Sequence, residues 1–197
     1  MCHTLIFTDG SIANNSLLNK KVGIAGFMFT TLTNNDKYIQ PWRSEFVVSS
    51  KNKLDIHRLE LGAVTMAMHC ISFYVPHRVS IFTDSDKTYK TLVQGYFGND
   101  GEYKIVASYA TQYYQRLIEL GFDTNIVLCK SHVSIDKQCD YLTKTGTKPS
   151  TWSTAIISAG NSMIDRYVSS IAKYGDLQRL EQYNENDPLR KGCFITA

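Results

Sequence analysis

The spacing of hydrophobic and polar positions along the chain predicts strands that alternate with helices. Apolar runs bounded by turn residues are typical of buried strands, and apolar positions three to four residues apart are typical of helices. Strands are expected at residues 3–9, 22–31, 38–50, 78–84 and 124–132. Helices are expected at residues 55–74, 86–94, 103–120, 135–146 and 151–174, with a hairpin turn at residues 32–37.

Three strands followed by strands that alternate with helices predict the α/β class, with a five-stranded mixed sheet flanked by helices. Residues 1–148 are interpreted as one such domain, and residues 149–197 as a C-terminal helical extension with a polar tail. The apolar residues of the helix at 151–174 could pack on the sheet, mediate dimerisation or dock another protein. Their spacing leaves these three roles open.

The composition narrows the class of protein without giving its function. With 43% hydrophobic and 20% charged residues, the 197-residue chain is typical of a folded protein. Its net charge of +3 means that contact with nucleic acid would depend on a local basic patch. The apolar runs are too short to cross a bilayer, and no secretory signal is recognisable, so no membrane contact is expected. Five scattered cysteines favour reduced thiols and a cytoplasmic location.

Four acidic residues end or interrupt apolar segments. Asp9 and Asp84 each end a predicted strand, in FTDGS and FTDSD. Glu60 lies in the first turn of an apolar helix, and Asp140 interrupts the helix at 135–146. Each has an ordinary explanation as a turn, capping or solvated residue. If the two strands are parallel neighbours, however, their carboxylates meet at one sheet edge. Such a cluster is unfavourable unless a cation neutralises it, and Mg²⁺ prefers these ligands.

The motifs that contain these acids resemble the ribonuclease H family. TDGS includes Asp9, RLEL includes Glu60, and TDS includes Asp84. KSH is followed by CDYL, which includes Asp140. The resemblance covers residues 3–146 and implies the family's fold, a five-stranded mixed sheet with helices. It also implies that the four acids bind two Mg²⁺ ions, for which Mn²⁺ can substitute.

The same resemblance implies further roles in catalysis and substrate binding. His132, in the loop after the last strand, corresponds to the family's mobile histidine, which assists proton transfer or product release. Arg58 precedes Leu59 and Glu60 as a basic residue does in the family. Substrate contacts are expected from Gly10, Ser11, Asn14, Asn15, His57, Arg58, Ser85 and Lys130.

The chain departs from the family pattern in several places. His57 replaces an asparagine that in many members contacts the RNA strand, and the segment IANNSLLNKK replaces a glycine-rich turn. No lysine-rich handle occurs between residues 95 and 105. Asp86 and Asp136 are additional acids, each either an outer carboxylate of the site or an ordinary helix charge. Phosphates could be met by Lys20, Lys21, Lys130, Lys137, Lys144 and Lys148.

The resemblance implies an endonuclease that hydrolyses the RNA strand of RNA–DNA hybrids by a two-metal-ion mechanism and leaves 5′-phosphate products. Two alternatives stay open. The first is a DNA nuclease with this fold, of the resolvase or integrase type, and the second is a non-catalytic module that binds nucleic acid or a protein. TDGS and the loop with His132 favour the ribonuclease. Degenerate members commonly lose one of the acids, and none is missing from this sequence.

Overall fold

The computed structural model of the protein describes residues 2–33, 38–40, 42–49, 54–146 and 151–176. Its strands are β1 (His3–Asn15), β2 (Lys20–Thr33), β3 (Tyr38–Ile39), β4 (Arg43–Ser49), β5 (Arg78–Thr83) and β6 (Asp123–Leu128). Its helices are α1 (Ile56–Ile71), α2 (Asp86–Gln94), α3 (Gly101–Glu119), α4 (Ile135–Lys144) and α5 (Thr151–Tyr174). Part of the predicted hairpin turn (34–37), Lys148 and the polar tail from residue 177 lie outside the described residues.

The strands form one mixed sheet in the order β3–β2–β1–β5–β6, and β4 also pairs with β2. β1 is antiparallel to β2 and parallel to β5, which in turn is parallel to β6. The predicted strand at 38–50 is divided into β3 and β4, both of which pair with β2. The five longer strands confirm the predicted five-stranded mixed sheet.

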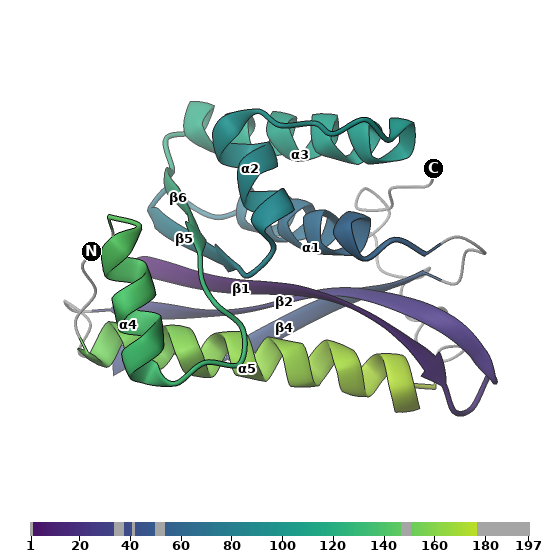
Figure 1. Ribbon diagram of the computed structural model, residues 1–197. Helices are drawn as coiled ribbons and strands as arrows, with labels where there is room; N and C mark the ends of the chain where they lie inside the picture. Colours follow the sequence, from purple (N-terminus) through teal and green to yellow (C-terminus); the bar gives the residue numbers. More distant parts are fainter. Residues whose placement is uncertain (1, 34–37, 41, 50–53, 147–150, 177–197) are drawn as a thin grey trace.

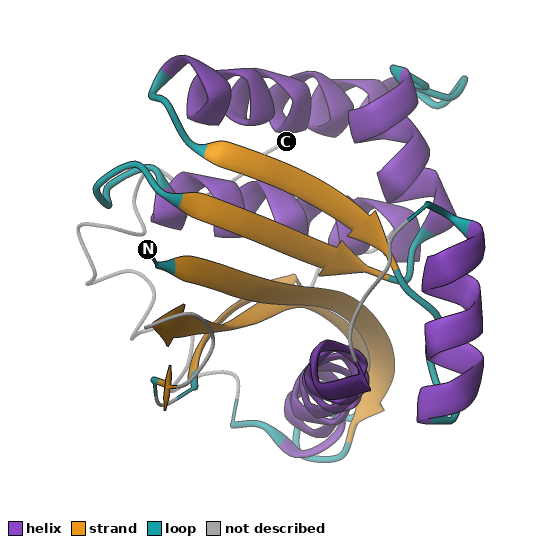
Figure 2. Ribbon diagram, turned by 90° about the vertical axis from the view of Figure 1, so that its left-hand side faces the viewer, coloured by secondary structure: helices purple, strands orange, loops and turns teal. Residues whose placement is uncertain are grey.

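Helices cover both faces of this sheet, as Figures 1 and 2 show. On one face, Ile6 and Phe27 of the sheet share a buried core with Leu61 of α1 and with residues of α3. On the other face, Phe7 and residues of β2 share a second core with α5. Successive residues of a strand point to opposite faces, so Ile6 and Phe7 contribute to different cores. Within the described residues, none of the helices combines the length and hydrophobicity needed to span a membrane.

β1 is longer than the sequence pattern predicts. The expected end of this strand at Asp9 is wrong, because β1 continues to Asn15 and stays paired with β2 throughout. The chain reverses only after Asn15, whose side-chain Oδ1 accepts hydrogen bonds from the N–H groups of Leu17 (3.0 Å) and Leu18 (2.9 Å). Side chains of asparagine commonly stabilise turns in this way. The Asp9–Gly10 pair is therefore part of a strand and not a turn.

The helix at 151–174 packs on the sheet, which is one of the three roles left open by its sequence. A Cβ atom at Gly160 would lie only 2.5 Å from the Phe7 ring, so α5 approaches β1 closely at this glycine. The Phe7 ring is stacked on Phe82 of β5, with 4.9 Å between ring centroids. The domain boundary at residue 148 stays a prediction, but α5, which follows it, packs on the same sheet as the residues before it.

Candidate active site

Parallel pairing of β1 with β5 brings two of the predicted acids together. Phe7 is the last β1 residue paired with β5, opposite Phe82, and Asp9 and Asp84 each follow two residues later. One carboxylate oxygen from each of Asp9, Glu60 and Asp84 lies within 4.8 Å of the others. The prediction that Asp9 and Asp84 meet at one sheet edge is therefore confirmed, and Glu60 joins them from α1.

Glu60 reaches this edge because α1 lies unusually close to β1. A Cβ atom at Gly10 would be 2.9 Å from the backbone nitrogen of Glu60 and 2.9 Å from Leu59 Cβ, so only glycine fits here without a shift. Asp55 caps α1, because its side chain accepts a hydrogen bond from the His57 N–H (2.9 Å). Glu60 therefore lies in the second turn of α1. The prediction that it lies in the first turn is wrong.

The Glu60 side chain is only 8% exposed, and one of its oxygens lacks a hydrogen-bond partner. Among the described residues, no group donates to Glu60 Oε2, which is fully buried. A buried carboxylate oxygen without a partner is costly, and coordination of a cation removes that cost. The Gly10 N–H donates to Asp9 Oδ1 at 2.8 Å, and the Asp9 and Glu60 carboxyl groups also share a side-chain hydrogen bond.

The electrostatics of the group also favour a cation. The pKa of Asp9 is raised from 3.8 to about 7, first by burial and then by the charge of Asp84. Burial raises the pKa of Glu60 well above its ordinary value, with the charges of Asp9 and Asp84 adding to the effect. Ionised carboxylates at this edge repel one another in a site with little water, so a divalent cation would stabilise their charged forms. The oxygen-only ligand set fits Mg²⁺ or Mn²⁺.

The structure does not bring Asp140 into this group of acids. Asp140 is exposed on α4, and the group that could hold a metal among the described residues consists of Asp9, Glu60 and Asp84. Asp136 is exposed in the first turn of the same helix. The role of Asp140 as fourth ligand is therefore a prediction that the geometry does not support. The physical reason is that α4 packs against α5 instead of crossing the sheet itself.

Another acid, Asp165 of α5, lies close to the site. Its Oδ2 atom is 3.7 Å from Nε2 of His132, and its charge is one of those that raise the pKa of Asp9, after burial and Asp84. Sequence reasoning missed Asp165 because it assigned α5 to an extension. A usable signal was present, since Asp165 is the one acidic residue between positions 151 and 174.

The predicted strand at 124–132 ends earlier, at Leu128, so His132 lies in the loop between β6 and α4, where the family resemblance places it. It is exposed, and its backbone φ of 53° lies in the left-handed region, which histidine adopts more readily than most residues. The ends of this loop are fixed. The Cys129 N–H donates to the Thr83 carbonyl (2.9 Å), and the Lys130 N–H donates to Oε1 of the buried Gln138 (3.1 Å).

The predicted substrate residues on β1 fall into two groups. Asn14 is exposed and Ser11 is half-buried, with its Oγ 3.2 Å from Ser169 Oγ. Asn15, in contrast, is buried, and its Nδ2 donates to the carbonyl of Ala172 on α5 and to that of Gly175 just after the helix. Its side chain makes these contacts within the fold, so the geometry does not support a substrate contact from Asn15, which stays a prediction. Gly10 has no side chain, and its absence lets α1 pack close to β1. A substrate contact from Gly10 stays a prediction.

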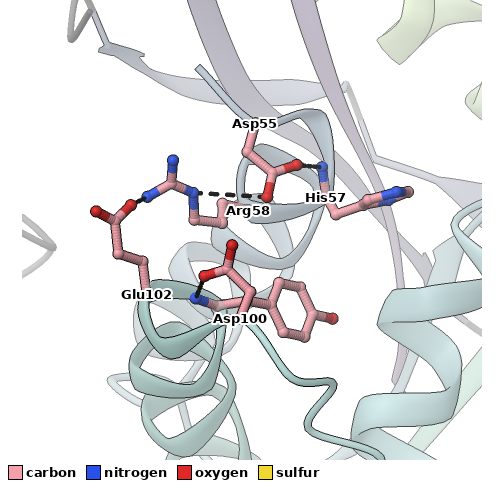
Figure 3. Close-up of polar contacts among 6 residues, drawn as sticks. Asp55, His57, Arg58, Asp100 and Glu102 are labelled. Carbon is pink, nitrogen blue, oxygen red and sulfur yellow. Dashed lines mark hydrogen bonds and ion pairs between the residues drawn. The ribbon is translucent and has the colours of Figure 1, made fainter. Parts of the chain in front are cut away.

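The predicted substrate residues near the start of α1 and α2 differ in their contacts with the rest of the protein. Figure 3 shows Arg58 between two carboxylates, Asp55 of its own helix cap and Glu102 of α3, while His57 points away from them. His57 is exposed. Ser85 caps α2, since its Oγ accepts a hydrogen bond from the Thr88 N–H. The assigned roles of these residues in substrate binding stay predictions.

A groove of about 1020 Å³ extends from the acidic group along α2. Glu60 and Asp84 form part of its wall, and it is also lined by His57, Ser85, Asp86, Lys87, Lys90 and Tyr96. Asp86 Oδ2 lies 2.6 Å from Lys90 Nζ, so this additional acid is paired within α2. The groove therefore offers polar groups of both charges next to the carboxylates.

Comparisons with known proteins bear on the family of this chain. The family model of RNase H matches residues 2–148. A comparison with curated proteins found no match. The chain is similar to the N-terminal RNase H domain of a Mycobacterium tuberculosis protein, solved as a fusion with maltose-binding protein, at 11% identity and a TM-score of 0.47. That similarity covers 75% of this chain and 100% of the other.

Two further solved structures are similar to this chain. A type 1 RNase H with the type 2 active-site motif is 15% identical with a TM-score of 0.47, over 82% of this chain and 84% of the other. RNase H1 from the halophilic archaeon Halobacterium salinarum is 17% identical with a TM-score of 0.42, over 71% and 93%. Because the family model matches about three quarters of the sequence, the chain belongs to the ribonuclease H family.

Proposed function

We propose that this protein is a metal-dependent endonuclease that hydrolyses the RNA strand of RNA–DNA hybrids and leaves 5′-phosphate products. Membership of the RNase H family supports nuclease action on such hybrids in general. The choice of hybrid over DNA duplex, the two-metal mechanism and the product ends are parts of the proposal. A cytoplasmic location and a protein partner for the segment 151–174 also stay predictions.

One observation carries the proposal of catalysis. Three carboxylates from three separate elements, β1, α1 and the end of β5, converge within 4.8 Å, and a buried oxygen of one of them lacks a partner. A folded chain gains nothing from such a cluster on its own, because burial and repulsion both oppose ionisation. The cluster becomes favourable when a hard cation is bound.

Asp9, Glu60 and Asp84 would hold the metal, and we propose two Mg²⁺ ions with Mn²⁺ as a substitute. When bound, such ions stabilise the attacking water and the leaving oxygen of an in-line displacement at phosphorus. The groove beside Glu60 and Asp84 gives a phosphodiester backbone access to the carboxylates. The exposed Lys130 and the half-buried Lys87 can contact neighbouring phosphates, a contribution that does not depend on base sequence.

His132 is proposed to move a proton at the edge of this site. Its imidazole is exposed, and its Nε2 atom faces the Asp165 carboxylate at 3.7 Å. An imidazole in such a position can accept a proton from water or deliver one to a leaving oxygen. The backbone hydrogen bonds of Cys129 and Lys130 fix the start of this loop, and His132 follows two residues later.

The test is cleavage of one labelled sequence presented as RNA–DNA hybrid, double-stranded RNA, single-stranded RNA and double-stranded DNA. Each substrate is incubated with Mg²⁺, with Mn²⁺ and with EDTA. The Asp9→Asn variant removes one carboxylate of the site. Asp123→Asn is the matched control, because it removes one negative charge from an exposed residue at the start of β6, the opposite end of that strand from the site.

We expect metal-dependent cleavage of the RNA strand of the hybrid alone, lost in Asp9→Asn and kept in Asp123→Asn. Preferred cleavage of double-stranded DNA would replace the proposal with a DNA nuclease. Circular dichroism checks that the protein is folded in these assays. If the folded protein binds the hybrid but cleaves none of the substrates, it is a non-catalytic module.

A further inference from the structure

α5 runs along β1, and its contacts follow the order of the strand residues. Gly160 lies against Phe7, since a Cβ atom there would be 2.5 Å from the ring. About two turns later, Ser169 Oγ lies 3.2 Å from Ser11 Oγ. Asp165 lies between these two contacts on the helix, so it falls opposite the part of β1 that lies between Phe7 and Ser11.

Asp9 is the central residue of that part of β1. Alternate residues of a strand point to the same face, so Phe7, Asp9 and Ser11 all point toward α5. The register partner of Asp9 on β2 is Gly26, and a Cβ atom at Gly26 would be 2.6 Å from Val168 Cγ1. α5 therefore passes over Asp9 as it runs along β1.

The side of α5 that carries Asp165 also contacts the end of β6. Asn161 Oδ1 lies 3.5 Å from Cys129 Sγ, and residues four apart on a helix share one side. One turn after Asn161, the Asp165 carboxylate lies 3.7 Å from His132 Nε2 and is 31% exposed. Asp165 lies outside the group of three acids whose oxygens are within 4.8 Å of one another. It lies at the rim of the site, next to the loop histidine.

We propose that Asp165, on a helix beyond the segment matched by the family model, supplies the fourth carboxylate of the acidic site in place of Asp140. This inference rests on the proposed metal-dependent function. It is supported by the buried, unpartnered Glu60 Oε2, which points to a bound cation, and by the exposed position of Asp140 on α4. α5 is then part of the active site and not an appendage to it.

If Asp165 has this role, its loss should lower both the affinity for the metal and the rate of cleavage. A fourth negative charge strengthens the attraction for a divalent cation, and loss of a carboxylate near a metal typically lowers affinity or activity by about 10- to 100-fold. A residue with only a packing role would change the free energy of unfolding and leave the metal affinity of the folded protein unchanged. Affinity therefore separates the two roles.

The experiment compares the full chain with Asp165→Asn, Asp165→Glu, Asp140→Asn and the control Asp123→Asn. Binding of Mn²⁺ alone is measured by isothermal titration calorimetry, and thermal unfolding in EDTA shows that each variant is folded. Single-turnover cleavage of the hybrid is then followed as a function of Mg²⁺ concentration. The titration with Mn²⁺ needs no substrate and does not depend on activity.

We expect Asp165→Asn to weaken Mn²⁺ binding at least about tenfold and to raise the half-saturating Mg²⁺ concentration to match. Asp165→Glu should restore part of the affinity, and Asp123→Asn should match wild type. If wild type binds Mn²⁺ and Asp165→Asn binds it equally well, or if Asp140→Asn causes the larger loss, the inference is overturned while the proposed function stands. If wild type neither binds Mn²⁺ nor cleaves, the proposed function fails and the inference fails with it.

Discussion

Gly10 and Glu60 are in such close contact that a single added carbon would disturb the acidic site. A Cβ atom at position 10 would meet the backbone nitrogen of Glu60 at 2.9 Å, and backbone atoms of a helix cannot turn aside as a flexible side chain can. The glycine of the TDGS motif is thus required by the approach of α1 to β1. This contact places Glu60 beside Asp9, and it leads to the first prediction.

Gly10→Ala should move α1 away from β1 and separate Glu60 from Asp9. Overpacking of this kind typically costs about 1–3 kcal/mol of unfolding free energy. We also expect weaker Mn²⁺ binding, because the carboxylates no longer converge. Urea unfolding and calorimetry measure the two effects. Gly62→Ala is the control, since a Cβ atom at Gly62 meets nothing within 4 Å and should stabilise the helix by up to about 1 kcal/mol. Equal behaviour of the two variants would contradict the packing explanation.

The stability of the metal-free protein should fall as the pH rises through the pKa of Asp9. Burial first, and then Asp84, raise the folded-state pKa of Asp9 from 3.8 to about 7. The stabilising contribution of the protonated form is complete below the unfolded pKa and is lost toward about pH 7. One such proton changes the unfolding free energy by at most about 1.4 kcal/mol per pH unit.

Urea unfolding in EDTA over this pH range, for wild type and Asp9→Asn, measures the effect. Because the other carboxyl groups titrate in both proteins, the difference between them reports mainly on the site. We expect wild type to lose stability relative to Asp9→Asn as the pH rises. A difference that does not change with pH would show that Asp9 titrates in the folded protein as it does in the unfolded chain.

Mg²⁺ should reverse this loss of stability. Metal ligands must be deprotonated, so Mg²⁺ competes with protons for Asp9 and Glu60. A ligand that binds only the folded state stabilises it by an amount that grows with the logarithm of ligand concentration over Kd, so the melting temperature rises. We expect a larger rise at about pH 8 than at about pH 5, and a much smaller rise in Asp9→Asn. Scanning calorimetry with and without Mg²⁺ measures it, and an equal rise in both proteins would place the ion elsewhere.

His132→Ala should slow cleavage without abolishing it. A positioned acid or base typically contributes about 10²- to 10⁴-fold, and His132 lies at the rim of the site on an exposed loop, so we expect the lower end of this range. Single-turnover and steady-state rates distinguish a role in the chemical step from one in product release. An unchanged rate in both measurements would remove His132 from the mechanism.

Gly160→Ala should loosen α5 from the sheet. The added methyl group would press on the Phe7 ring, which is itself stacked on Phe82, so neither ring can move freely. We expect a loss of about 1–3 kcal/mol of unfolding free energy in one cooperative transition. Unfolding followed by circular dichroism measures it. A separate early transition, in which helix is lost before the rest of the protein unfolds, would show α5 to be an independent unit.

Local sequence patterns determined most of the secondary structure of this protein. Helical spacing of apolar residues gave the position of α1, and Asp55 caps it as expected. The same spacing gave the position of α5. Apolar runs placed β2 and β5 within two residues of their ends. These features depend on neighbouring residues, so they are visible in the sequence.

The sequence also determined three of the acids of the site. Asp9, Glu60 and Asp84 occur in motifs typical of the ribonuclease H family, and each lies in an element that converges on one sheet edge. The end of β1 was missed, because Asp-Gly is also a common turn signal. Its continuation to Asn15 depends on pairing with β2, and this pairing is not a local property.

Only the tertiary structure placed Asp165 near enough to Asp9 for its charge to act on that carboxyl group. In sequence, Asp140 follows His132 closely and lies in a familiar motif, whereas Asp165 lies in a helix that looked like an extension. The packing of Gly160 on Phe7 and of Val168 on Gly26 places α5 over Asp9 and leaves α4 at its side. Such contacts join residues far apart in the chain. They depend on the shapes of both surfaces at once, which no local pattern of residues contains.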